Sequence, residues 1–166
     1  MLVNLKDVFA GGAPVDIDYT LDLSQLEVPG GTFPFAEAVR VLGRIENHAG
    51  VVTLEAEAQT MLHVICDRCL SPFKRNLHIP FQNILTDQQL DKENDHILVC
   101  MGQVLDMDLL VTTNLVLALP MKELCRPDCK GICPRCGKDL NSGPCNCKPE
   151  GHPAFLKLKE LLEDEQ

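Results

Sequence analysis

The sequence lacks the features that would place it in a membrane or send it out of the cell. No run of about 18 uncharged apolar residues is present, so we expect no transmembrane helix. The first seven residues contain no basic stretch followed by an apolar run, which predicts that there is no secretion signal. We therefore expect a cytoplasmic protein with reduced cysteines, because stable disulfides are rare in that compartment.

Basic residues and catalytic motifs are scarce as well. The 166 residues carry 15 Lys and Arg against 24 Asp and Glu, a formal net charge of −9. This balance argues against a protein that grips nucleic acid through a broad basic surface. The sequence has no glycine-rich phosphate loop, no nucleophile elbow, no zinc-protease pair of histidines and no deaminase His-x-Glu motif. We therefore expect a protein that is not an enzyme.

The apolar content is sufficient for one folded domain with a small appendage. Hydrophobic residues make up 45% of the chain, which is ordinary for a globular protein. Short runs of alternating apolar and polar residues are typical of half-buried strands, and turns separate them. These runs are residues 13–28, 37–46, 52–58 and 77–81, with 61–65 either continuing the third run or pairing with it. The pattern predicts an α+β fold made mainly of an antiparallel β-sheet or a small barrel.

Helical periodicity replaces this alternation near residue 106. Apolar residues recur at helical spacing up to Pro120, and Asp106 or Asp108 can cap the start. We expect a core helix over about 106–119 that lies on the sheet.

The domain organisation follows from the composition. We predict an antiparallel β domain over 1–120, a Cys-rich segment over 121–150 and a C-terminal amphipathic helix over 151–166. Six cysteines crowd into 121–150, which has almost no aliphatic side chains to bury. Such a segment cannot form its own core, so a metal is the obvious candidate for ordering it. The final helix would start at Pro153 and bury one apolar face.

The nine cysteines are the most unusual feature of the chain. Eight of them form close pairs, and Cys100, which follows an apolar triplet, is expected to be a small buried side chain. In a reducing compartment, paired cysteines indicate metal binding or redox activity before they indicate disulfides. The pairs are Cys66/Cys69, Cys125/Cys129, Cys133/Cys136 and Cys145/Cys147.

The strongest candidate metal site starts at Cys133 and Cys136, which are two residues apart and followed by Gly137, as in zinc knuckles. The glycine is expected to relieve crowding where backbone amides point at the sulfurs. Cys145 and Cys147 are the first choice for the other half of the site. Four thiolates make a closed tetrahedral site suited to zinc, with no open position for a substrate. We therefore predict a structural zinc ion.

The role of Cys125 and Cys129 is left open by the spacing. They could replace Cys145 and Cys147 as partners of Cys133 and Cys136, which makes them the second choice of ligands. They could instead join Cys66 and Cys69 in a second site, since eight paired cysteines divide into two sets of four. His152 is a less favoured substitute ligand, because a surface histidine near a helix start is the simpler interpretation.

Cys66 and Cys69 also fit the spacing of a redox dithiol. A reactive dithiol needs a lowered thiol pKa, which typically comes from a helix N-terminus. Here the pair is followed by Leu70, Ser71 and Pro72 and then by a predicted strand. Half of a metal site on a turn, or two thiols packed between strands, is therefore the favoured interpretation.

Four stretches of the chain resemble the bacterial YceD family of large ribosomal RNA subunit accumulation proteins. Together they cover the chain from about residue 60 to its end, and the third is the specific one. The stretches are 66–73, 105–110 running into 115–120, 129–141 with Cys145–Cys147, and 152–155 leading into the terminal helix.

This resemblance implies a cytoplasmic, non-catalytic protein needed for accumulation of large-subunit (23S) rRNA and hence for large-subunit biogenesis. Members similar to the proteobacterial type keep the Cys66/Cys69 pair but lack most of the later cysteines. This implies that the metal stabilises the C-terminal segment rather than performing the shared task.

Charge suggests the kind of partner. Residues 1–100 carry 7 basic and 14 acidic side chains, and ribosomal proteins are strongly basic. We therefore expect the partner to be a large-subunit ribosomal protein or a pre-ribosomal particle, bound through an acidic sheet face that includes Asp16, Asp18 and Asp22. Contact with rRNA is expected to be indirect. The alternatives are a direct RNA-binding zinc protein and a thiol redox protein that uses Cys66 and Cys69.

Overall fold

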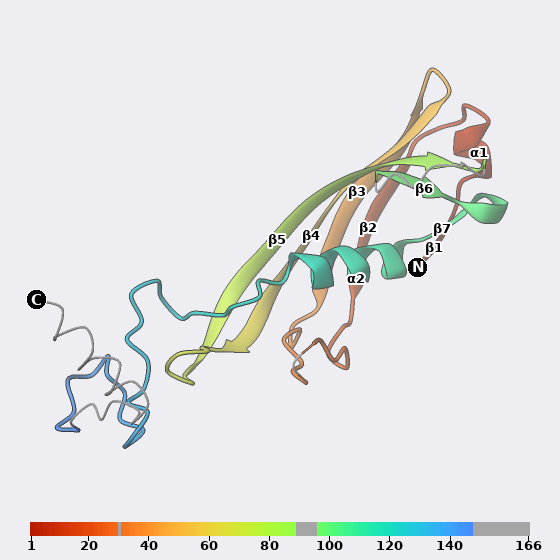
Figure 1. The fold of residues 1–166 in the computed structure, drawn as a ribbon. Helices are drawn as coiled ribbons and strands as arrows, with labels where there is room; N and C mark the ends of the chain where they lie inside the picture. The colour runs from red at the N-terminus through yellow and green to blue at the C-terminus, as the bar shows by residue number, and fades with distance from the viewer. Residues whose placement is uncertain (30, 89–95, 148–166) are drawn as a thin grey trace, which may run out of the picture.

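The main element of the fold is an open, five-stranded β-sheet. The computed structural model describes residues 1–29, 31–88 and 96–147 (Figure 1). The sheet has the order β2-β3-β4-β5-β6, in which β2 to β5 are antiparallel and β6 pairs parallel to β5. The strands are β2 (Val15–Leu21), β3 (Val39–His48), β4 (Val51–Ile65), β5 (Pro72–Thr86) and β6 (Ile97–Val99). The expected antiparallel sheet is confirmed, while its alternative, a closed barrel, is not formed by the described strands.

Most strands follow the alternation of buried and exposed residues, and they extend beyond their predicted bounds. On β4, every second residue from Val52 to Leu62 is buried, and the residues that alternate with them are exposed or half-buried. The alternation keeps its phase through Thr60, so residues 52–58 and 61–65 form one strand. On β5 the pattern extends beyond 77–81 in both directions, but polar Arg75 and Asn83 stand at inward positions. A polar residue facing inward hides the period-two signal.

Helix α2 (Met107–Ala118) lies against the sheet and β1, close to the expected span of 106–119. The Asp106 side chain accepts hydrogen bonds from the backbone N–H groups of Asp108 (3.1 Å) and Leu109 (3.2 Å), so Asp106 is the N-cap. The core side of the helix consists of Met107, Val111 and Leu115, all fully buried. None of the helices in the described part of the chain has the length and apolar character needed to cross a bilayer.

Several short elements were not predicted. Strand β1 (Leu2–Asn4) pairs antiparallel with β7 (Val104–Asp106), helix α1 (Lys6–Phe9) follows β1, and a 3-10 turn (Met101–Gln103) precedes β7. Each has only three or four residues, which is too short for a periodic pattern to emerge from the sequence. Cys100, just before the 3-10 turn, is buried as expected.

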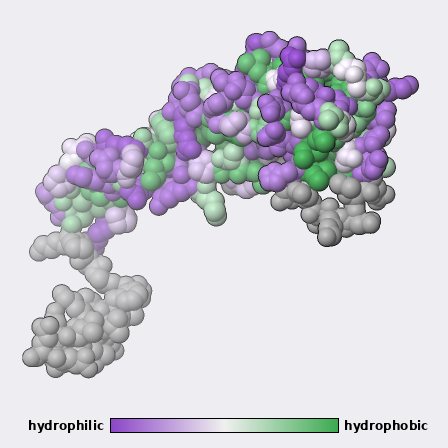
Figure 2. Space-filling view, turned by 90° about the horizontal axis from the view of Figure 1, so that it is seen from above, coloured by the Kyte–Doolittle hydropathy of each residue, from purple (hydrophilic) through white to green (hydrophobic). Residues whose placement is uncertain are grey.

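Strands β4 and β5 continue beyond the rest of the sheet as a two-stranded arm. Strand β3 pairs only with residues 51–59 of β4, whereas β5 pairs with residues 52–65. The arm therefore consists of 60–65 and 72–77, and its tip is the turn 66–71 (Figure 1). After α2 the chain runs to this tip, where residues 121–147 lie. Seen from above, the elongated surface is mostly hydrophilic, with hydrophobic patches between (Figure 2).

The division into a β domain (1–120), a Cys-rich segment (121–150) and a C-terminal helix (151–166) stays a prediction. In the described part of 121–150, the regular structure is an isolated bridge between Ile132 and Asp139. The predicted C-terminal helix over 151–166 lies outside the described residues.

Candidate metal centres

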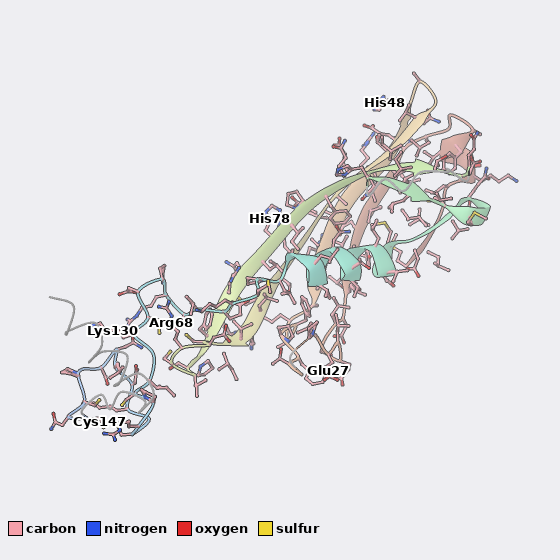
Figure 3. All side chains as sticks on the ribbon, in the orientation of Figure 1. Glu27, His48, Arg68, His78, Lys130 and Cys147 are labelled. Carbon is pink, nitrogen blue, oxygen red and sulfur yellow. The ribbon has the colours of Figure 1, made fainter. Side chains whose placement is uncertain are left out.

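The thiols of eight cysteines gather in two groups of four at the tip of the arm. Within each group, all four sulfur atoms lie within 4.8 Å of one another. The first group, here called the hairpin cluster, contains Cys66, Cys69, Cys125 and Cys129. The second group, here called the knuckle cluster, contains Cys133, Cys136, Cys145 and Cys147. The side chains of the two clusters lie at the end of the molecule where Arg68, Lys130 and Cys147 are labelled (Figure 3).

One half of each cluster is built by the same backbone turn. In the first turn, Leu70 N–H donates to the Cys66 carbonyl (2.9 Å) and Cys66 N–H donates to Ser71 (3.0 Å). In the second, Gly137 N–H donates to the Cys133 carbonyl (2.9 Å) and Cys133 N–H donates to Lys138 (2.8 Å). The two Cys-x-x-Cys stretches are therefore folded alike, although only the second carries the glycine that marks a knuckle in the sequence.

The residue after the second cysteine has a left-handed backbone in both turns. Gly137 has φ +70° and Leu70 has φ +58°. A Cβ at Gly137 would have no neighbour within 4 Å, so the expected reason for this glycine, relief of crowding, is wrong. The backbone conformation favours glycine there, whereas Leu70 adopts the same conformation at a steric cost.

The C-terminal segment is fastened to the arm by hydrogen bonds around the hairpin cluster. Asp67 and Glu123 exchange two of them: the Asp67 N–H donates to the Glu123 carbonyl (2.8 Å), and the Glu123 N–H donates to the Asp67 carboxylate (2.6 Å). The Arg68 guanidinium donates to the Cys129 carbonyl (2.8 Å), and the Ile132 N–H donates to the Arg68 carbonyl (3.0 Å). We call this set of contacts the clasp.

A close backbone approach completes the clasp. Gly131 has φ +75°, and a Cβ built there would lie 2.8 Å from the Arg68 carbonyl oxygen. Any larger residue would push the segment away from the turn. Arg75, at an inward position of β5, forms an ion pair with Glu123 (3.0 Å).

Asn141 links the two clusters. Its side-chain nitrogen donates to the Cys129 sulfur (3.4 Å) and to the Asp139 carboxylate (2.7 Å), and its side-chain oxygen accepts from Lys130 N–H (2.8 Å). Asn141 belongs to the loop that connects the two halves of the knuckle cluster, while Cys129 belongs to the hairpin cluster. An N–H···S contact of this kind stabilises a thiolate and orients it.

The sulfur separations fit a tetrahedral metal site. Cys66 and Cys129 sulfurs are 3.8 Å apart, and those of Cys69 and Cys125 are 3.7 Å apart. In a regular tetrahedron with Zn–S bonds of about 2.3 Å, neighbouring sulfurs lie about 3.8 Å apart. A disulfide would require about 2.05 Å. Both clusters can therefore hold a metal ion with four thiolate ligands.

Thiol acidity also differs within each cluster. Burial alone would raise the pKa of Cys66, but hydrogen bonds from the backbone amides of Cys125, Cys69 and Arg68 outweigh it and lower the pKa to about 6. Backbone amides of Cys136 and Arg135 likewise lower the pKa of Cys133 to about 6.

In each cluster, another cysteine has a pKa that is raised rather than lowered. Burial first, and then hydrogen bonds with the other thiols, raise the pKa of Cys125 to about 12. The neighbouring Cys136 thiol is the main cause of a similar rise at Cys147, to about 12. Because thiolates repel one another at this distance, four of them can coexist only around a cation.

The structure resolves the grouping of cysteines that spacing left open. The four first-choice residues of the sequence prediction lie together, and Cys125 and Cys129 lie with Cys66 and Cys69 rather than with Cys133 and Cys136. His152 lies outside the described residues. The pKa of Cys66 is lowered, as a redox dithiol requires, but its thiol is fully buried and no helix follows Cys69. The exposure typical of a redox dithiol is therefore not found there.

Three residues that shape these centres were missed by sequence reasoning: Asp67, Arg68 and Asn141. The signal for Asn141 was present, because an asparagine in a loop between two metal half-sites is well placed to bond backbone amides and sulfur. The role of Asp67 and Arg68 depends on a contact with residues more than 50 positions away, so no local pattern reveals it.

Comparison with known proteins assigns the chain to a family. The sequence pattern of the family described as "Large ribosomal RNA subunit accumulation protein YceD" matches residues 54–162, about two thirds of the chain. The chain belongs to the YceD family. The match covers most of β4, all of β5 and α2, and both clusters, and the resemblance seen in the sequence is confirmed.

The individual relatives that match are only distantly similar to this chain in sequence. An uncharacterized protein of Mycobacterium tuberculosis and one of Mycobacterium bovis are each 32% identical over 104 residues, covering 60% of this chain and 50% of theirs. A Zea mays protein named "Large ribosomal RNA subunit accumulation protein YCED homolog 1, chloroplastic" is 22% identical over 177 residues, covering 84% of this chain and 60% of the relative. The chain thus spans about half the length of the mycobacterial relatives. No solved structure matches it.

Proposed function

We propose that this protein is a non-catalytic factor required for accumulation of large-subunit (23S) rRNA, and that it works in the cytoplasm. The observation that carries this proposal is membership of the YceD family over residues 54–162. The maize relative, which is named for the same role, supports it. The partner in this proposal is a basic large-subunit ribosomal protein or an assembly intermediate that contains one.

The second part of the proposal is that each cluster holds one structural zinc ion. Four thiolates are the donor set that Zn²⁺ accepts in closed, four-coordinate sites, and the sulfur spacing of the hairpin cluster fits its bond length. The hairpin cluster would fasten residues 121–132 to the arm. The knuckle cluster would order residues 133–147, a stretch in which only Cys133 is buried. Zinc in a closed site supplies structure rather than reactivity, because no coordination position is open.

Binding rather than catalysis is also what the distribution of thiols favours. Eight cysteines belong to the two clusters, and the ninth, Cys100, is buried, with a pKa raised by burial. Once the clusters are filled with metal, none of these sulfurs is an accessible nucleophile. An acidic protein that holds a basic ribosomal protein needs no reactive group, and the net charge of −9 suits such a partner.

A depletion experiment tests the proposal. The gene is depleted in the source organism, and mature and precursor 23S and 16S rRNA are quantified by primer extension and gradient sedimentation. We expect 23S rRNA and free large subunits to fall several-fold while 16S rRNA stays within about 20%, by analogy with the family's name. Re-expression of the wild-type chain should restore both. An unchanged ratio of 23S to 16S rRNA would contradict the proposed function.

Affinity capture of the full chain separates a protein partner from RNA. Captured material is divided, and one half is treated with ribonuclease. A ribosomal protein that stays bound after treatment supports the proposed partner. If only 23S rRNA is captured, and binding falls steeply with salt, direct RNA binding replaces it. Zinc is measured on the same purified chain by elemental analysis, with two ions per chain expected.

A further inference from the structure

Helix α2 is apolar on the side that faces away from the sheet as well as on its core side. Leu109 is 66% exposed and Leu117 is 79% exposed, and they stand eight residues apart on one face of the helix. Met121, just beyond the helix end, is also fully exposed. A helix that is hydrophobic all round is normally buried on both sides.

The polar residues of α2 do little to make this face hydrophilic. The Thr113 hydroxyl, between Leu109 and Leu117 on the same face, donates to the Leu109 carbonyl (2.8 Å). The Asn114 side chain donates to the Leu110 carbonyl (2.9 Å). Both side chains are thus bonded back to their own helix, so covering them costs less than covering a polar group bonded only to water.

The outward face of the five-stranded sheet offers no comparable surface. Its charges are paired across strands: Arg44 with Asp16 (3.0 Å) and Arg40 with Asp18 (2.6 Å). Two of the three carboxylates expected to receive a basic partner are therefore already neutralised by arginines of the same sheet. The third, Asp22, accepts a hydrogen bond from Ser24 N–H (2.9 Å).

Charge indicates what can cover the α2 face. Residues 104–121 contain no Lys or Arg, and Lys122 follows them. Their two carboxylates are engaged within the protein, because Asp106 caps α2 and Asp108 pairs with the N-terminal ammonium. The charge that a partner meets is therefore that of the whole chain. A second copy of the chain would bring the same carboxylates and a net charge of −9 to this surface, and like charges disfavour that contact. A basic amphipathic segment would instead place its apolar side on Leu109 and Leu117, and its cations would be attracted by the net negative charge of the protein.

We propose that the outer face of α2, with Leu109, Leu117 and Met121, is the docking surface for a basic amphipathic helix of the partner protein. This inference rests on the proposed function for the nature of the partner, and it moves the contact from the acidic sheet face to α2. Apolar burial supplies the affinity, and the net negative charge of the chain favours a basic partner over a second copy.

The experiment measures binding of a fluorescein-labelled amphipathic peptide of about 18 leucines and lysines to the full, zinc-loaded chain. A leucine–glutamate peptide of the same length serves as the charge control. We expect the lysine peptide to bind and the glutamate peptide not to bind. The variant Leu109→Gln/Leu117→Gln should weaken binding at least tenfold, because it removes apolar contacts without altering charge.

The matched variant is Leu42→Gln/Ile84→Gln, which changes two exposed apolar residues on the outward face of the sheet, 36% and 39% exposed. It should change the affinity less than twofold. Equal binding by both variants, or no binding by the wild-type chain, would overturn the proposal. The proposal would also be overturned if the wild-type chain and the sheet variant sedimented as dimers while the α2 variant sedimented as a monomer. The occupant of the α2 face would then be a second copy of the chain.

Complementation separates this inference from the proposed function. In the depletion strain, the α2 variant should fail to restore 23S rRNA while the sheet variant restores it. If the α2 variant restores 23S rRNA fully, the docking surface is wrong and the proposed function stands. If depletion leaves 23S rRNA unchanged but the peptide binds through α2, the proposed function is wrong and the docking surface stands.

Discussion

The sheet body and the cysteine-rich segment bury different kinds of side chains. The body has a continuous core of aliphatic and aromatic residues, among them Phe35, Leu54 and Leu115, all with no exposed surface. Around the hairpin cluster, the buried residues in the described part of the chain are Cys66, Cys69 and Cys129, and the partly buried Phe73, Leu124 and Ile132 pack beside them.

This difference shows two ways of offsetting the entropy lost on folding. Apolar burial stabilises by about 25 cal/mol per Å², so a body of some 120 residues can stabilise itself. A segment of 27 residues with few apolar side chains cannot, and needs a metal or a covalent link. The following predictions test whether the two regions are independent in this sense.

The largest effect is expected from metal removal. A strong chelator with a mercurial thiol reagent should remove two zinc ions per chain, and residues 121–147 should lose amide-exchange protection. Strands β3 and β4 should keep theirs, because their hydrogen bonds and core do not involve sulfur. The segment would lose a binding free energy of the order of 10 kcal/mol per site. Equal loss of protection in both regions would show that the body also depends on the metal.

Removing single cysteines should distinguish the two clusters. Cys69→Ala should release one zinc ion and open the clasp, because this cluster joins segments 56 or more residues apart. Cys136→Ala should release the other ion and leave the clasp closed, because all four of its cysteines lie within residues 133–147. Native mass spectrometry counts the ions, and amide exchange at Asp67 and Glu123 reports the clasp. Loss of both zinc ions in the Cys136→Ala variant would contradict the prediction that the hairpin cluster keeps its ion without the knuckle cluster.

A core substitution should act on the body alone. Leu54 is fully buried on β4, and Leu54→Ala is expected to cost about 2–5 kcal/mol in the free energy of unfolding. Urea unfolding measures this cost. The zinc content and the protection of residues 121–147 in the native state should not change. A drop in zinc would mean that the arm transmits the damage to the clusters.

Asn141 should couple the clusters by a smaller amount. Its side chain donates to the Cys129 sulfur and is the main cause of the lowered pKa of that thiol. Asn141→Ala is expected to weaken metal binding at the hairpin cluster about tenfold, as is typical for outer-shell partners. Competition with a zinc-binding dye measures the affinity. Asn76→Ala, on the exposed face of β5, is the control and should have no effect.

The smallest expected effect concerns the two turns. Leu70→Gly removes a leucine from a left-handed backbone and should leave stability unchanged or raise it by up to about 1 kcal/mol. Gly137→Ala should lower stability by a similar amount, because its φ is +70°. Thermal unfolding of the two zinc-loaded variants gives the comparison. Destabilisation by Leu70→Gly would show that the leucine side chain itself is needed.

Local sequence patterns were sufficient for elements whose cause is local. The alternation along β2 to β5 follows from the two-residue period of strands, and the Asp106 cap follows from the preference of carboxylates for helix starts. The Cys133-x-x-Cys136-Gly turn was predictable for the same reason, since its hydrogen bonds close within six residues. The short strands β1 and β7 were not, because three residues carry no period.

The sequence by itself therefore determined a strand-rich body, a helix over about 106–119 and a segment that cannot form an apolar core. Only the tertiary structure decided which cysteines meet. Every pair had the spacing of a half-site, but Cys125 and Cys129 reach Cys66 and Cys69 because the β4–β5 arm carries that turn to them and Asp67, Arg68 and Gly131 hold it there. Contacts between residues far apart in the chain depend on where the sheet places them, and spacing alone does not contain that information.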